Sequence, residues 1–395
     1  MGLLSPCYEA MMRRWDPLNT EQTTRIRRVR GPLLRWYDKN ARDLPWRRSS
    51  DPFAIWISEA MLQQTRVETV IPYWERFLAA FPDVESLARA DLDDIYSVWT
   101  GLGYYSRARN LKHAAETIVA DHAGQLPDTV AELRELKGIG RYTAGAVASI
   151  AFDREEPLVD GNVIRVFTRL LGIREESTSK EVVAHLWEVA DVLVHGPRPG
   201  DLNQALMELG ATVCTPKKPE CQACPIHRHC AAFADGNAEE LPIKKKKPKP
   251  KPMRAIAAWI ERDGKILVAR RPEEGLMAGL WELPGGEIGT KEEGKDRLEE
   301  IIQNVIGLAI RDPHSLGHVE HVFTHRKLDL EIFRCRLDKG QRVLRSGYAA
   351  HRWVRPKAIL ELAHAGPTRK AMMLLGWTDE ISARQAGRTT ERKKR

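Results

Sequence analysis

A run of lysines and prolines at residues 244–254 divides the chain and limits how it can fold. The run reads KKKKPKPKPMR, and its like charges and prolines oppose a compact element and favour an extended linker. Before it, over about residues 21–235, apolar residues recur at spacings of three and four, which predicts helices. Beyond it, short runs rich in β-branched residues predict strands. A chain of 395 residues with such a break is expected to form two main domains.

The predicted organisation is therefore an all-α domain followed by an α+β domain. Five parts are expected: an N-terminal extension (1–20), a helical domain (21–235), a basic linker (236–254), an α+β domain (255–380) and a basic tail (381–395). In the second domain we expect a hairpin over 255–270 that turns at Gly264, a helix over 291–306, and strands over 328–337 and 349–354. No stretch approaches the roughly 18 consecutive apolar residues that a membrane-spanning helix needs, so a membrane protein is not expected.

Four of the six cysteines lie within 17 positions of one another, as C-x6-C-x2-C-x5-C at Cys214, Cys221, Cys224 and Cys230. The disulfides of a secreted scaffold would not cluster in this way, the first residues lack the apolar core of a signal peptide, and no transit peptide is expected. We therefore expect a cytoplasmic protein with a metal-binding cysteine group. Structural zinc and four unliganded cysteines are the alternatives, although the unequal spacing fits paired zinc knuckles poorly.

The cysteine loop also carries basic residues. His227 and His229 are expected at the surface and not as ligands. Lys217, Lys218 and Arg228 are expected to face either a phosphate backbone or solvent.

Residues 136–150, LKGIGRYTAGAVASI, have the pattern of a helix end, a tight turn and a new helix. Gly138 and Gly140 permit a sharp bend, and the N–H groups at the start of the following helix are suited to a phosphate. An ordinary corner between two helices would have a similar pattern, so this motif alone does not establish DNA binding.

Two acidic residues are candidates for catalysis. A helix is predicted from Phe53 to about Val70, with Asp51 as its N-cap, and in it Glu59 shares a face with apolar residues. Burial there would raise the pKa of the Glu59 carboxyl and keep it protonated, as a general acid requires. Asp160, in the segment VDGN (159–162), is the second candidate. The alternatives are a Glu59 side chain that reaches solvent or pairs with an arginine, and an Asp160 that only caps a helix or forms an Asx turn.

The segments SEAMLQQT (58–65), GLGYYSRARNL (101–111), LKGIGRYTA (136–144), VDGN and the cysteine loop together resemble MutY-type adenine DNA glycosylases of the endonuclease III superfamily. The resemblance implies one [4Fe-4S] cluster on the four cysteines. It also implies that Glu59 protonates adenine at N7, that Asp160 stabilises or captures the oxocarbenium-like sugar, and that Asn162 helps to hold Asp160. This is the two-carboxylate chemistry of retaining glycosidases applied to a nucleoside.

Further roles follow from the same resemblance. Strand-cutting members of the superfamily carry a lysine where this chain has Tyr142, which implies base removal by water alone, although Tyr142 also suits a packing role. Because a base inside a duplex must be flipped out, Gln64 and Tyr104 would act as wedges. Four residues would line the adenine pocket, although the first two also suit ordinary packing: Leu44, Trp46, Arg47 and Gln204.

Residues 279–308 resemble a Nudix segment that has lost its metal ligands. Glu292 is retained, but the positions of the later glutamates hold Ile301, Asn304 and Val305, which cannot bind Mg²⁺, so hydrolysis is expected to be absent. In the resembling family this domain reads 8-oxoguanine through a Phe-Ser-His loop, to which HVFTH supplies Phe323, Thr324 and His325. The alternative is an alternating strand with Phe323 facing inward.

The sequence thus predicts a monomeric adenine DNA glycosylase that acts on duplex DNA containing adenine opposite 8-oxoguanine, and also opposite guanine, near the nucleoid. The rivals are a strand-cutting glycosylase for oxidised pyrimidines, a non-catalytic iron-sulfur DNA-binding module and a Nudix hydrolase with a helical appendage. The net charge of +8 is weak evidence, because the linker carries +7 and residues 384–395 carry +5, which leaves −4 elsewhere.

Overall fold

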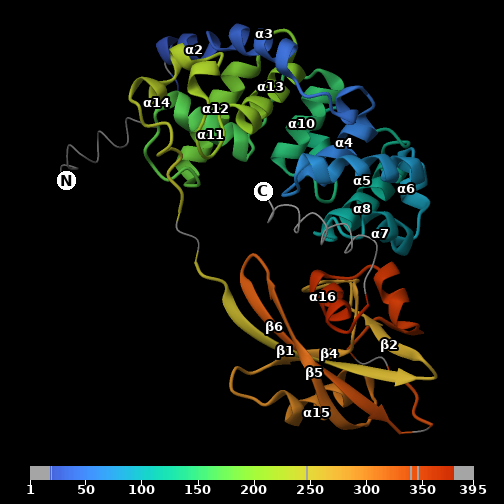
Figure 1. The fold of residues 1–395 in the computed structure, drawn as a ribbon. Coiled ribbons are helices and arrows are strands. Elements are labelled where there is room, and N and C mark those ends of the chain that lie inside the picture. Colours follow the sequence, from blue (N-terminus) through green and yellow to red (C-terminus); the bar gives the residue numbers. More distant parts are fainter. Residues whose placement is uncertain (1–17, 19, 246–247, 339, 345–346, 378–395) are drawn as a thin grey trace, which may run out of the picture. The chain divides into compact units, whose positions relative to one another are not determined.

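The computed structural model describes residues 18, 20–245, 248–338, 340–344 and 347–377 (Figure 1). The predicted basic tail and all but two residues of the predicted N-terminal extension lie outside the described residues. The chain separates into two compact units, residues 1–89 with 110–246 and residues 90–109 with 247–395. No helix in the described ranges combines the length and the apolar character needed to cross a bilayer.

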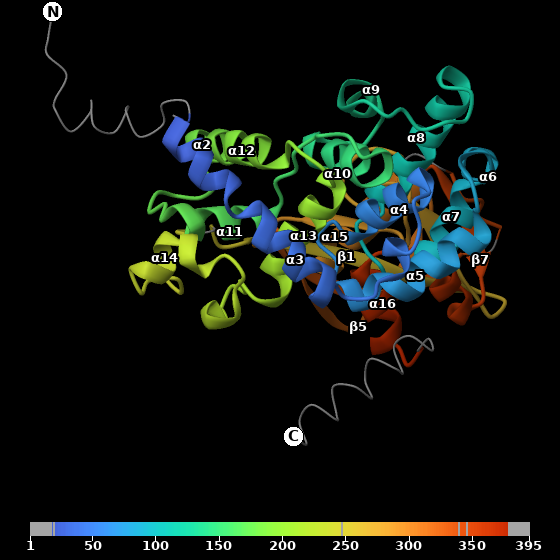
Figure 2. The ribbon, with the colours of Figure 1, turned by 90° about the horizontal axis from the view of Figure 1, so that it is seen from above.

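Helices account for the ordered elements over the described residues 20–234, which confirms the predicted all-α region. The α-helices are α2 (Thr20–Arg27), α3 (Arg30–Asn40), α4 (Pro52–Leu62), α5 (Val67–Ala80), α6 (Val84–Arg89), α7 (Leu92–Trp99), α8 (Ser106–Asp121), α9 (Val130–Glu135), α10 (Arg141–Phe152), α11 (Gly161–Leu171), α12 (Lys180–Val194), α13 (Pro199–Thr212) and α14 (Ala231–Ala234). Short 3-10 turns are η1 (Pro45–Arg47), η2 (Cys221–Ala223) and η3 (His227–His229). Figure 2 shows α2 beside α12, and these helices join α11 and α13 around a common apolar core.

The helix that carries Glu59 begins as predicted but ends earlier. The Asp51 carboxylate accepts hydrogen bonds from the amides of Phe53 and Ala54, which confirms it as the N-cap of α4. The helix stops at Leu62 and not near Val70, because Gln64 adopts a left-handed backbone conformation with φ +57°. A new helix, α5, starts at Val67. The break brings Gln64 and its neighbours to the wall of the cavity described below.

The boundary between the units differs from the predicted one in a single segment. Residues 90–109, expected in the helical domain, group with the C-terminal residues. Polar contacts explain this grouping, because Arg109 donates to the carbonyl of Ala278 at 2.9 Å and Arg352 donates to Asp93 at 3.1 Å. Sequence periodicity indicates where helices form but not which of the two units each helix belongs to.

The C-terminal unit is built on a seven-stranded mixed sheet with the order β3-β2-β1-β6-β5, in which β4 pairs with β1 and β7 with β2. Its strands are β1 (Lys251–Arg262), β2 (Lys265–Arg270), β3 (Trp281–Glu282), β4 (Gly285–Ile288), β5 (Ile310–Val322), β6 (Arg326–Leu337) and β7 (Ala350–Val354). Helix α15 (Gly294–Ile306) packs against β1, β4 and β5, while α16 (Gly366–Leu374), which follows the turn η4 (Pro356–Glu361), packs against β5 (Figure 1). The predicted hairpin, helix and two strands are confirmed.

The predicted linker overlaps the first strand. β1 starts at Lys251 and pairs in parallel with β6, with Lys251 opposite Arg326 and Met253 opposite Leu328. Met253 is buried, so this end of the Lys-Pro run belongs to the sheet. Prolines are tolerated because they stand at the beginning of the strand, where few ladder hydrogen bonds are lost.

Candidate active site

A cavity of about 770 Å³ opens in the helical unit between α4, α10, α11 and α13. Glu59, Tyr142, Asp160 and Asn162 line it, together with all four residues predicted for the adenine pocket and with Gln64, Gly138 and Gly140. Chain segments more than 150 residues apart in sequence thus meet at one site. Such a concave space with a few convergent polar groups is typical of a ligand site.

Glu59 is buried, with 5% of its surface exposed, as its helical periodicity predicted. Its Oε2 accepts a 2.7 Å hydrogen bond from the hydroxyl of Tyr142. Burial raises the pKa of the Glu59 carboxyl to about 7, and the nearby Asp160 adds to the rise, whereas Tyr142 and Arg47 oppose it. A carboxyl with such a pKa is protonated in a large fraction of molecules at neutral pH and can donate a proton.

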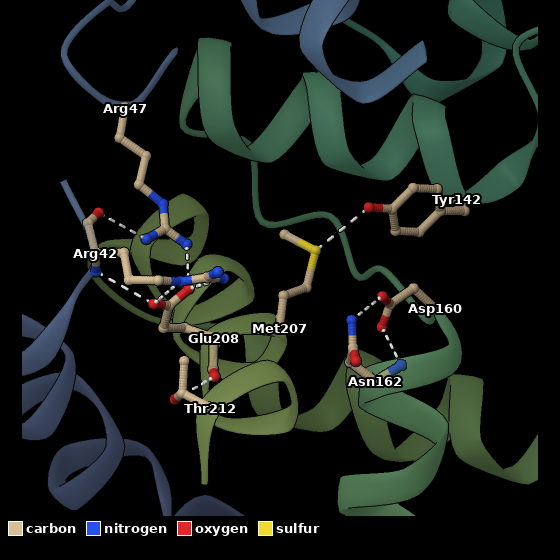
Figure 3. Close-up of polar contacts among 8 residues, drawn as sticks. All are labelled: Arg42, Arg47, Tyr142, Asp160, Asn162, Met207, Glu208 and Thr212. Carbon is tan, nitrogen blue, oxygen red and sulfur yellow. Dashed lines mark hydrogen bonds and ion pairs between the residues drawn. The ribbon is translucent and has the colours of Figure 1, made fainter. Parts of the chain in front are cut away.

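Asp160 is the N-cap of α11, so the alternative reading of this residue is also correct. Its Oδ1 accepts from the amide of Asn162 at 2.9 Å, and Oδ2 accepts from the Asn162 side chain at 2.8 Å (Figure 3). Oδ1 also accepts from the amide of Val163 at 2.7 Å. Burial raises the pKa of the Asp160 carboxyl, and these hydrogen bonds oppose the rise. The carboxylate therefore has a fixed orientation at the cavity wall, which capping and catalysis can share.

Tyr142 connects the two sides of the cavity. Its hydroxyl lies 2.7 Å from Glu59 Oε2 and 3.3 Å from the sulfur of Met207, the latter contact being drawn in Figure 3. Burial raises the pKa of the phenol well above its ordinary value, and the adjacent acids raise it further. Tyr142 therefore keeps its proton and serves as a hydrogen-bond donor to Glu59.

Asn162 is in turn held by Arg165, one turn further along α11. Arg165 Nη2 donates to Asn162 Oδ1 at 2.9 Å, and its Nε donates to the carbonyl of Cys214 at 2.7 Å. The first cysteine of the loop is thus connected to the Asp160 carboxylate through two side chains.

The predicted pocket residues lie together, and two of them are also packing residues. Leu44 and Trp46 are buried, and the Trp46 ring meets that of Trp74 edge-on at 6.0 Å. Arg47 lies at the end of η1, and Gln204 lies on α13, half-buried at the cavity. Leu44 and Trp46 thus pack in the core and also line the cavity, and their role in binding adenine stays a prediction.

Sequence reasoning missed Arg42, Met207 and Glu208, which also line the cavity. The Glu208 carboxylate binds the guanidinium groups of both Arg42 and Arg47 (Figure 3). The available signal was a single acid within the apolar stretch ALMELGA of α13, since an unpaired carboxylate would be costly there.

The predicted wedge and turn residues have unusual backbone geometry. Gln64 and Tyr104 both have positive φ, +57° and +50°, and Tyr104 is 48% exposed. Tyr104 belongs to the second unit, where the Arg107 guanidinium lies 5.5 Å from its ring. Gly138 has φ +86°, and a Cβ there would lie 2.6 Å from Asn110 Cβ, whereas Gly140 adopts a conformation open to any residue.

The four clustered cysteines line a second cavity, together with Arg169. Arg169 Nη1 donates to Cys214 Sγ at 3.2 Å, and its Nη2 is buried with no hydrogen-bond partner among the described residues. In the described part of the chain, no three His, Cys, Asp or Glu side chains are grouped so as to hold a single metal ion. Four thiols around a cavity with an unpaired cationic donor fit an anionic iron-sulfur cluster.

Two features of the C-terminal unit match the sequence analysis. Ile301, which stands where a Nudix enzyme needs a glutamate, is buried in the apolar core of this unit. Phe323, Thr324 and His325 form the turn between β5 and β6, so the predicted alternative of an inward-facing strand residue is wrong. Phe323 is half-buried, its amide bonds the Arg326 carbonyl, and its ring meets His321 edge-on at 4.6 Å.

Comparisons with known proteins agree with this geometry. Residues 57–191 match the HhH-GPD superfamily base excision DNA repair protein family, and residues 255–374 match the NUDIX domain family. The chain is 39% identical to an adenine DNA glycosylase of Mus musculus, over 79% of this chain and 71% of the relative. It is 38% identical to an adenine DNA glycosylase of Rattus norvegicus, over 82% and 73%. A solved thermostable thymine-DNA glycosylase superposes with a TM-score of 0.50 at 28% identity, over 54% of this chain and 98% of that one.

Proposed function

The chain belongs to the adenine DNA glycosylase family of base excision repair, and from this premise we propose that it hydrolyses the N-glycosidic bond of adenine paired with 8-oxoguanine, or with guanine, without cutting the strand. The observation that carries the proposal is the pair of acids on one cavity: Glu59 buried with a raised pKa, and Asp160 fixed at a helix start. Both acids have a chemical task in this reaction.

Glu59 supplies the proton. Adenine is a poor leaving group until a ring nitrogen is protonated, and a carboxyl with a pKa of about 7 can transfer its proton at physiological pH. In this proposal N7 of the flipped adenine receives the proton. The Tyr142 hydroxyl holds the Glu59 side chain and stabilises the carboxylate that remains.

Asp160 acts at the sugar. Loss of protonated adenine leaves positive charge on C1′ and the ring oxygen, and the Asp160 carboxylate lines the same cavity as Glu59. Its amide and Asn162 hydrogen bonds fix its orientation before the charge develops, so little reorganisation is needed. Asp160 then stabilises or captures the cation, and water completes the hydrolysis.

Strand cleavage would require an amine to form a Schiff base with C1′, and this position of the motif is Tyr142. The phenol is held protonated between Glu59 and Met207, so it is not a nucleophile. The proposed product is therefore an abasic site in an intact strand.

Base flipping is part of the proposal because Glu59 is buried. A duplex cannot enter the cavity, but one extruded base can, with Gln64 and Tyr104 filling the gap in the stack. The turn of Phe323, Thr324 and His325 would read 8-oxoguanine. The hydroxyl of Thr324 is exposed and can donate or accept a hydrogen bond.

Cys214, Cys221, Cys224 and Cys230 would hold a [4Fe-4S] cluster, with Arg169 as a charge partner. A bound cluster would cross-link the loop and fix the Cys214 carbonyl that Arg165 binds. We also propose that the protein binds DNA as a monomer and acts at the nucleoid.

The experiment is release of adenine from a labelled duplex by the full-length protein. With adenine opposite 8-oxoguanine, we expect abasic sites that break only after alkali. A strand break before alkali would overturn the assignment of Tyr142. No adenine release from any pair would contradict the proposed reaction, while release only opposite guanine would contradict the reading of 8-oxoguanine.

A further inference from the structure

Glu208 is a buried carboxylate at the adenine cavity to which no catalytic step has been given. Its side chain has 0% exposure and accepts four N–H groups. Arg42 donates through its amide at 3.1 Å, Nε at 2.7 Å and Nη2 at 3.0 Å, and Arg47 donates through Nη2 at 2.8 Å (Figure 3). One helix, α13, thus binds one arginine that precedes η1 and one that ends it, both more than 160 residues away in sequence.

The charges in this cluster do not cancel. Two guanidinium groups share one carboxylate, which leaves a net positive charge at the wall of the cavity. Burial alone would raise the pKa of the Glu208 carboxyl, but the hydrogen bonds from Arg42 and Arg47 outweigh it and lower that pKa. Glu208 is therefore ionised at neutral pH, and a single guanidinium would already balance its charge. The surplus donor points to a use of the cluster beyond packing.

The cluster of Arg42, Arg47 and Glu208 immobilises the Arg47 side chain. Nη2 binds Glu208, Nη1 donates to the carbonyl of Arg42 at 3.0 Å, and the guanidinium lies 5.4 Å from the Tyr37 ring centre. Its side chain is 14% exposed and lines the cavity. A guanidinium has five N–H groups, so these two bonds leave donors available for a ligand.

We propose that Glu208 is a positioning residue that sets base specificity by fixing the Arg47 guanidinium for donation to N1 or N3 of the flipped adenine. The inference rests on the proposed function, which places adenine in this cavity. Arginine only donates, and adenine offers the acceptors N1, N3 and N7. Since N7 takes the proton from Glu59, N1 and N3 remain for Arg47. Guanine carries hydrogen on N1, so a fixed donor at that edge would also disfavour guanine.

The test is Glu208→Gln, which keeps the shape of the side chain and removes its charge. Single-turnover release is measured for adenine, 1-deazaadenine and 3-deazaadenine, each opposite 8-oxoguanine, with wild type and variant. A misplaced Arg47 should lower the rate on adenine by about tenfold to a hundredfold. The loss should be clearly smaller on the analogue that already lacks the contacted nitrogen.

Asp43→Asn is the matched control. Asp43 is an exposed carboxylate that pairs with Arg48 beside the same turn, so the control removes the same charge without touching the cavity. Its rates on all three bases should equal those of wild type. Binding to a duplex with an abasic-site analogue, in which the pocket holds no base, should stay within about threefold for Glu208→Gln because the DNA contacts are unchanged.

An equal loss on all three bases would show that Glu208 acts only in packing, and no loss would show that Arg47 is held without it. Either result overturns the inference. If Glu208→Gln fails to fold or to bind the abasic duplex, Arg42→Gln replaces it, because Arg42 is a third exposed and its loss weakens the same cluster. The loss of rate with Arg42→Gln must then also be smaller on the analogue that lacks the contacted nitrogen. Wild type inactive on every adenine pair would instead contradict the proposed function.

Discussion

Replacing Glu59 by glutamine should abolish adenine release and yet stabilise the folded protein at neutral and alkaline pH. The Glu59 carboxyl is buried and its pKa is raised to about 7 from an ordinary value of 4.5. Ionisation is therefore harder in the folded chain than in the unfolded chain. Glutamine is nearly isosteric, does not ionise, and can still accept the hydrogen bond from Tyr142.

The sign and size of the change in stability follow from the pKa of Glu59 in the folded chain and in the unfolded chain. Below the unfolded value of 4.5, both states are protonated and ionisation costs no stability. As pH rises from there to about 7, the unfolded chain loses its proton first, so wild-type stability falls. Above about 7 both states are ionised and the loss is complete. A shift of roughly 2.5 pKa units corresponds to about 3 kcal/mol.

The assay is urea unfolding of full-length wild type and Glu59→Gln at pH 5 and pH 8, followed by helix content. The free energy of unfolding of the variant, relative to that of wild type, should increase by about 2 to 3 kcal/mol from pH 5 to pH 8. Glu208→Gln is the control of opposite sign, because the pKa of that carboxyl is lowered in the folded state. The stability that ionised Glu208 contributes is present above its unfolded pKa and is lost as pH falls.

One outcome refutes the reasoning. If the difference in unfolding free energy between wild type and Glu59→Gln is the same at pH 5 and pH 8, then Glu59 is not held protonated by its surroundings. Its assignment as the general acid would then lose its physical basis, even if the variant is inactive.

Three further outcomes are expected. Adenine release by wild type should decline above a pH of about 7. Tyr142→Phe should move that decline upward by about one pH unit, because the hydrogen bond from Tyr142 favours the ionised form of Glu59. A downward shift of the single-turnover pH profile would contradict this. Cys224→Ser should reduce iron content and visible absorbance and lower the thermal stability of the helical unit, and unchanged iron would contradict the cluster. Replacing the lysines of 244–249 by serine should flatten the salt dependence of duplex binding while leaving adenine release from bound substrate unchanged, which filter binding and single-turnover rates would check.

The burial of Glu59, the proposed catalytic acid, could be predicted from sequence because it is a local property. The spacing of Ile55, Glu59 and Leu62 places the carboxyl on the apolar face of one helix, and the helix and its cap are as predicted. The end of that helix was predicted too late, since the left-handed conformation of Gln64 occurs in a segment, 63–66, that contains neither glycine nor proline to signal a break.

Glu208 and Arg42 could not be predicted from sequence for the opposite reason. Their contact joins residues 166 positions apart, and a lone acid in an apolar stretch indicates that a partner is needed but not which residue supplies it. The grouping of residues 90–109 with the C-terminal unit is likewise decided by long-range contacts such as that of Arg109 with Ala278. Periodicity indicates which face of a helix is buried but not which partner covers it.

The partners of the three carboxylates explain how one cavity holds them in different protonation states. Burial raises the pKa of Glu59, whose hydrogen-bond partner is a neutral phenol, while hydrogen bonds from two guanidinium groups lower the pKa of Glu208. Asp160, bound by amides, is held in orientation without a countercharge in direct contact. An ammonium group at position 142 would stabilise the Glu59 anion and remove its proton at neutral pH. In the proposed reaction, tyrosine at this position offers no amine to the sugar, and its neutral hydroxyl lowers the pKa of Glu59 less than a cation would.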